Sequence, residues 1–126
     1  MNKWIASASA LMFVTLIAHV FGGGPEVIDV VAAANLPDTV RALSSVVWHG
    51  TTLMLAISVI ALAYLATRHN PALEVFIAVW QIGLAALFIG YGLIQLGSLW
   101  PMPQWIVFLL MPAITFVGSR NRQPAT

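Results

Sequence analysis

The fold is decided by the longest uncharged stretch of the chain, residues 75–119, which reads VFIAVWQIGLAALFIGYGLIQLGSLWPMPQWIVFLLMPAITFVGS. One membrane crossing needs about 20 apolar residues, so this stretch is too long for a single helix and must fold back. The break falls at residues 97–103, GSLWPMP, where two prolines remove backbone donors and a glycine favours a turn. We therefore expect one helix to end near Gly97 and the next to begin near Pro103.

Two further uncharged stretches, residues 4–24 and 42–67, each have the length of another crossing. In this chain of 126 residues, 60% are hydrophobic and only 7% are charged, whereas soluble domains carry about 25% charged residues. Lipid must therefore cover most of the surface. The sequence predicts an all-α fold, a single integral membrane domain over residues 1–126. Its four transmembrane helices, near residues 4–21, 39–67, 72–97 and 103–118, are expected to form a four-helix bundle.

The cationic residues predict the orientation of these spans. On one side of a four-span arrangement lie Lys3, Arg68, Arg120 and Arg122, and only Arg41 lies on the other side. Because cytoplasmic loops carry an excess of lysine and arginine, we expect both termini on the cytoplasmic side. The compact loops fit a protein of the bacterial inner membrane.

The link between the first two predicted spans carries the signals of a short helix on the outer side. Pro25 suits the first position of a helix, and Glu26 and Asp29 favour its positive N-terminal end. Asn35 can end it. With Gly22–Gly24 acting as the preceding turn, we expect a short interfacial helix that rests on the bilayer.

Two histidines fall inside predicted spans, where ionisable side chains are functional candidates because their desolvation must be compensated. At 1.5 Å per residue, His19 lies ~24 Å along its helix from Lys3, and His49 lies ~28 Å from Arg68. Both histidines therefore occupy one layer near the outer face. The other side chains expected in this layer are Tyr91, Gln95 and Trp105. We predict an outward-facing polar pocket walled by these five residues and closed over by Glu26 or Asp29.

The two histidines are compatible with several kinds of ligand. Two imidazoles from different helices could ligate a b-type haem, and with Glu26 they could offer a divalent metal ion two nitrogens and one oxygen. Neither spacing is specific. The alternative is that His19 and His49 each bond to a carbonyl or hydroxyl group of a neighbouring helix. The residues alone do not name a cofactor.

A glycine stripe marks the third predicted span. Gly83, Gly90 and Gly97 repeat every seven residues on one side of the helix, and small residues let a second transmembrane helix approach closely. This pattern favours a small accessory or ligand-binding subunit. Such a subunit would pack against copies of itself or against a larger membrane complex.

Two other functions remain open at this point. One is a haem- or metal-binding membrane protein with His19 and His49 as ligands, and the other is a minimal oligomeric transporter of a small or lipophilic solute. Enzymatic activity is disfavoured, because the chain has no nucleophile elbow, no zinc-protease motif and no close pair of intramembrane carboxylates. A net charge of +1 argues against a nucleic-acid partner, and the absence of cysteine excludes thiolate chemistry.

Overall fold

A computed structural model describes residues 1–121, and this part of the chain is helical with no strand. Its elements are α1 (Lys3–Ala18), the π-helix η1 (His19–Ile28), α2 (Asp29–Ala33), α3 (Asp38–Thr67), α4 (Pro71–Leu96) and α5 (Gln104–Arg120). Three continuous helices are long and apolar enough to cross a membrane, namely Lys3–Ala33, Asp38–Thr67 and Pro71–Leu96. The fourth, α5, is shorter. The all-α prediction is confirmed, while Arg122, which entered the charge count, lies outside the described residues.

Local sequence explains where these helices begin and end. The Oδ1 atom of Asn2 accepts hydrogen bonds from the first backbone N–H groups of α1, and Asn70 does the same for α4, directly before Pro71. Both are favoured arrangements, because the first N–H groups of a helix lack partners within it. Gly97 ends α4 in the left-handed region, with φ at 63°. Side chains other than glycine and asparagine avoid that region, so the glycine fixes the stop.

The first helix differs from the prediction. We expected a turn at Gly22–Gly24 and a separate interfacial helix after it, but the helix continues through η1 into α2 without a break. Pro25 lies inside η1, where its missing N–H and its ring would disturb regular α-helical bonding. A local π-helical adjustment accommodates proline and glycine within an apolar helix. The glycines therefore continue the helix, and the separate interfacial helix is not seen.

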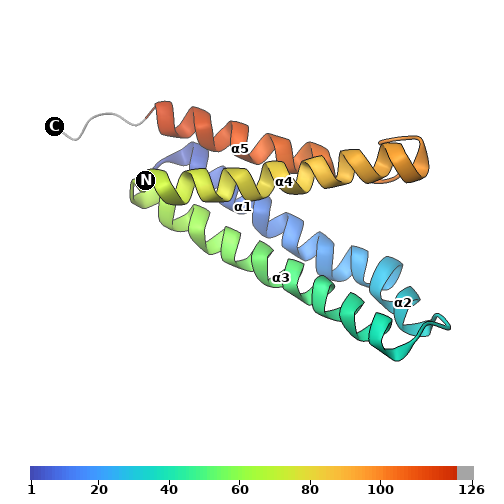
Figure 1. The fold of residues 1–126 in the computed structure, drawn as a ribbon. Helices are drawn as coiled ribbons and strands as arrows, with labels where there is room; N and C mark the ends of the chain where they lie inside the picture. The colour runs from blue at the N-terminus through green and yellow to red at the C-terminus, as the bar shows by residue number, and fades with distance from the viewer. Residues whose placement is uncertain (122–126) are drawn as a thin grey trace.

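The four helices run antiparallel and form two diverging arms (Figure 1). The α1–α3 arm consists of α1, η1, α2 and α3, and the α4–α5 arm consists of α4 and α5. Within each arm the helices pack along their length, and α1 also packs against α5. Among the described residues, η1 and α2 pack against neither α4 nor α5. The arms are therefore joined at one end of the molecule and apart at the other.

The closed end, where the arms meet, is tied together by Asn2. Its backbone N–H donates to the carbonyl oxygen of Ala66 at 2.7 Å, and its Nδ2 donates to the carbonyl oxygen of Gly118, also at 2.7 Å. One residue thus connects the start of α1 with the last turns of α3 and α5. We call the other end of the molecule, which holds α2 and the α4–α5 loop, the open end.

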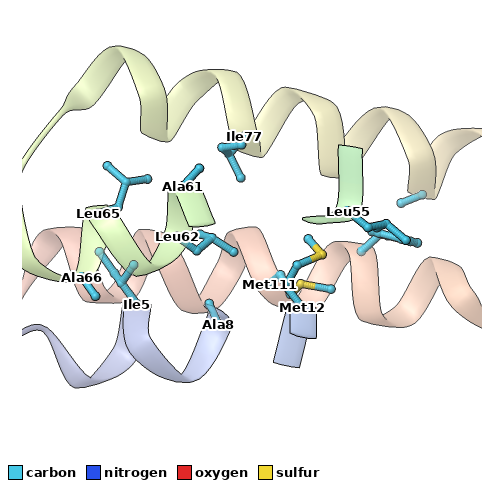
Figure 2. Close-up of a cluster of buried hydrophobic side chains, with 12 residues drawn as sticks. Ile5, Ala8, Met12, Leu55, Ala61, Leu62, Leu65, Ala66, Ile77 and Met111 are labelled. Atoms are coloured by element: carbon cyan, nitrogen blue, oxygen red, sulfur yellow. The ribbon is translucent and has the colours of Figure 1, made fainter. Parts of the chain in front are cut away.

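The hydrophobic core lies towards the closed end. Figure 2 shows side chains from α1, α3, α4 and α5 meeting there, among them Ile5, Met12, Leu62 and Met111. Between residues 13 and 54 the only buried residue is Gly24. The outer part of the α1–α3 arm therefore has no core of its own beyond the contact between its two helices.

Candidate functional site

The structure divides the six residues of the predicted outer pocket between the two arms. On the α1–α3 arm are His19, Glu26 and His49, and on the α4–α5 arm are Tyr91, Gln95 and Trp105. The arms are separated at the open end (Figure 1), and all of these side chains except His19 and Trp105 are exposed. The six residues do not come together in one pocket.

His19 is nevertheless held in a defined polar contact. Its ring stacks on the indole of Trp48, with ring centroids 4.0 Å apart and an interplanar angle of 19°. Its Nε2 lies 2.9 Å from Oγ1 of Thr52. Because the Thr52 hydroxyl donates its proton to the carbonyl oxygen of Trp48, its oxygen accepts from His19, which places a proton on Nε2. We refer to these three residues as the His19 cluster.

The π-helix positions the His19 cluster through Gly23. A Cβ atom added to Gly23 would lie 2.8 Å from Cη2 of Trp48, closer than side chains normally approach. The absence of a side chain at this position therefore lets the indole lie across η1, where it covers both Gly23 and the His19 ring. Trp48 was not among the residues predicted for the site. The sequence feature that could have indicated Trp48 is an aromatic residue in the second predicted span together with three consecutive glycines at the end of the first.

His49 bonds to its own helix rather than to this cluster. It is exposed, and its Nδ1 lies 2.7 Å from the carbonyl oxygen of Ser45 in the same helix, to which it can donate. Glu26 is also exposed. Among residues 1–121, no three histidine, aspartate or glutamate side chains gather closely enough to hold a metal ion. The expected set of His19, His49 and Glu26 is therefore not assembled.

The α4–α5 arm contains a buried amide that sequence analysis did not include in the site. Gln81 is fully buried, and its Nε2 donates to Sδ of Met111 at 3.8 Å. Its Oε1 has no protein hydrogen-bond partner, and neither has Nε1 of the half-buried Trp105. Tyr91 remains 54% exposed although it lies on the same half of α4 as Gln81.

The opposite side of α4 is open. Cβ atoms added at Gly83 and Gly90 would meet nothing within 4 Å, and Ala86 between them is exposed. A shallow groove over Gly90 is lined by Ala86, Leu87, Gly90, Tyr91 and Ile94. We call Gly83, Ala86 and Gly90 the α4 glycine face. Gly97, the third glycine of the predicted stripe, ends the helix and is not part of this face.

Comparison with known proteins identified no relative of this chain. No protein-family model matches the chain, and neither a curated protein nor a solved structure matches it.

Proposed function

We propose that this chain is a four-span integral membrane protein that acts as a small, non-enzymatic accessory subunit of a membrane assembly. The observation that carries the proposal is the open α4 glycine face, on which a Cβ added to Gly83 or Gly90 would meet nothing within 4 Å among the described residues. The partner is a further transmembrane helix, either from another copy or from a larger complex. That helix packs on α4.

The physical reason lies in how helices associate in lipid. Lipid tails are as apolar as leucine, so burial of large side chains gives little driving force between transmembrane helices. Close backbone approach at small residues increases van der Waals contact, and the interfaces of such helices are enriched in them. The α4 glycine face offers two such positions seven residues apart, beside a shallow groove.

The membrane placement follows from length and charge. Three helices are long enough to cross, and α5 has 17 residues, or about 25 Å at 1.5 Å per residue, close to the ~30 Å of the hydrocarbon layer. Lys3, Arg68 and Arg120 lie at helix ends at the closed end, and Arg41 pairs with Asp38 at the open end. The positive-inside rule therefore supports a cytoplasmic closed end.

The unburied outer part of the α1–α3 arm adds to this proposal. Only Gly24 is buried between residues 13 and 54, while large apolar side chains such as Phe13, Val46 and Leu53 are exposed. The isolated chain thus presents much of two helices to its surroundings. A partner subunit or lipid covers these surfaces in the membrane.

Replacing Gly90 with leucine tests the proposed assembly. A Cβ atom at this position meets nothing within 4 Å among residues 1–121, and leucine favours the helix more than glycine does, so folding should be unaffected. Overpacking at an interface amounts to about 1–3 kcal/mol, which weakens association roughly 5- to 150-fold. Membranes solubilised in a mild neutral detergent should show the wild type above its monomer mass on native electrophoresis. The Gly90→Leu variant should move to the monomer position.

The matched control is Ala113→Leu, which adds a similar side chain at an exposed position of α5. It should migrate like the wild type. A wild type that runs as a monomer, or a Gly90→Leu variant that migrates unchanged, would count against the assembly.

A further inference from the structure

A groove runs between α1 and α3 on the outside of the α1–α3 arm, beginning at the closed end. Its lining is mostly small and apolar and consists of Met1, Ala6, Ser9, Ala10, Phe13, Val59, Ala63 and Ala66. Ser9 donates its hydroxyl proton to the carbonyl oxygen of Val59 at 2.9 Å. The one hydroxyl group in the groove is thereby satisfied, which leaves a surface suited to an alkyl chain.

A lysine stands at the mouth of this groove. At 100° per residue, Lys3 lies on the same side of α1 as Ala6, Ala10 and Phe13. From Lys3 to Phe13 the helix rises about 15 Å, which is half of the ~30 Å hydrocarbon layer. The groove therefore matches the depth of one leaflet, with a cation at its surface end.

A second cation is brought to the same place by the hydrogen bonds of Asn2. The backbone N–H of Asn2 donates to Ala66, which lines the groove, and Arg68 follows two residues later. Lys3 follows Asn2 directly. The backbone positions of Lys3 and Arg68 are therefore held near each other at the closed end, beside the end of the groove.

Few acidic groups compete for these cations. Glu26, Asp29 and Asp38 lie at the open end, whereas Glu74 at the closed end accepts from the Ser119 hydroxyl and faces His69. Among residues 1–121, neither Lys3 nor Arg68 takes part in an ion pair. The rim of the groove is therefore positively charged and open to an anion.

We infer that this groove binds an anionic phospholipid of the cytoplasmic leaflet. Lys3 and Arg68 hold the phosphate group, and one acyl chain lies along the groove between α1 and α3. Basic clefts between transmembrane helices on the cytoplasmic side are suited to such headgroups. The site uses the proposed membrane placement but not the α4 glycine face, so it stands or falls independently of the assembly.

The expected selectivity follows from the two cations. Each lysine or arginine near the membrane surface strengthens attraction to anionic lipid by about fivefold, so two give roughly a 25-fold preference over a zwitterionic lipid. Purified, delipidated full-length protein is mixed with phosphatidylglycerol or phosphatidylcholine of identical acyl chains, and native mass spectrometry counts bound lipids. The wild type should retain one phosphatidylglycerol with at least a tenfold preference.

Two sets of variants separate headgroup from acyl-chain binding. The double variant Lys3→Gln, Arg68→Gln should bind both lipids equally, while Arg41→Gln, which removes the same charge at the open end, should keep the preference. Ala10→Leu and Ala63→Leu fill the groove and should lower phosphatidylglycerol binding severalfold. Millimolar glycerol phosphate should not displace the lipid, because it lacks the acyl chain.

Three results would overturn the inference. They are equal binding of the two lipids by the wild type, an undiminished preference in the double charge variant, and displacement of the lipid by glycerol phosphate alone. The first and third need no substitution, so the site can be refuted even if a variant fails to fold. Increasing salt should also reduce the preference in the wild type, because screening weakens exposed charges.

Discussion

Replacing Gly118 with alanine should open the joint between the two arms. A Cβ atom at this position would lie 2.8 Å from Cγ1 of Ile5, 2.9 Å from Cβ of Trp4 and 3.0 Å from Oδ1 of Asn2. Two of these neighbours are close to the backbone of α1 and cannot rotate away. The start of α1 must therefore move from α5, and the bond from Asn2 to the Gly118 carbonyl oxygen must lengthen.

The size of the effect follows from three contributions. Forcing an extra carbon into a packed contact destabilises by about 1–3 kcal/mol. Weakening the 2.7 Å bond from Asn2 to Gly118 adds about 1 kcal/mol. Alanine favours a helix over glycine by up to about 1 kcal/mol, and less here because residue 118 lies in the last turn of α5. The net loss of unfolding free energy is therefore about 1–3 kcal/mol.

The matched control is the same substitution at Gly50 in the body of α3, where an added Cβ meets nothing within 4 Å. Gly50→Ala should stabilise the protein by up to about 1 kcal/mol, since only the helix preference changes. Unfolding is followed in mixed micelles by the near-ultraviolet circular dichroism of the tryptophans as the fraction of dodecyl sulfate rises. If Gly118→Ala unfolds at the same fraction as Gly50→Ala or later, the close contact at the joint is refuted.

Two further substitutions test the His19 cluster in the same unfolding assay. Gly23→Ala should destabilise by about 1–3 kcal/mol, because its Cβ would lie 2.8 Å from the Trp48 indole, and an unshifted Trp48 indole N–H resonance would contradict the contact. Thr52→Val removes the acceptor for Nε2–H of His19 and should destabilise by about 1–3 kcal/mol. The imidazole nitrogen shifts of His19 should change in this variant but not in Thr51→Val, and equal spectra would argue that the bond is absent.

Helix positions could be predicted well because their signals are local. Each of the last three helices begins and ends within two residues of the expected range. Runs of uncharged residues determine the bodies of the helices. In α4, Asn70 and Pro71 determine the first turn and Gly97 determines the end, each through contacts with residues nearby in sequence. None of these interactions depends on how the helices pack.

The course of the first helix could not be predicted because it depends on a contact distant in sequence. Three consecutive glycines before Pro25 have the local signature of a turn. In the structure the Trp48 side chain on α3 packs against Gly23, and the helix continues as a π-helix around this contact. A tertiary interaction thus overrode the local preference.

The six residues predicted for the outer pocket are divided between the two arms, because height along a helix does not fix lateral position. Counting residues placed His19 and Tyr91 in one layer, and both lie towards the open end. Counting residues does not reveal that η1 diverges from α5. Because of this divergence, His19 and Tyr91 lie on separate arms (Figure 1). Gln81 is buried and Gln95 exposed for the same reason, since only the part of α4 near the closed end belongs to the shared core.

The closed end is where the proposed properties of the two arms meet. The lipid groove lies on the α1–α3 arm and the α4 glycine face on the other arm, and Asn2 with Gly118 holds α1 against α5. Gly90→Leu should therefore change assembly without changing lipid preference, and the charge variants of the groove should do the reverse. Gly118→Ala displaces the start of α1, which carries Lys3, relative to α5 and should alter both. If it altered neither while lowering stability, the joint would hold the fold together without positioning either surface.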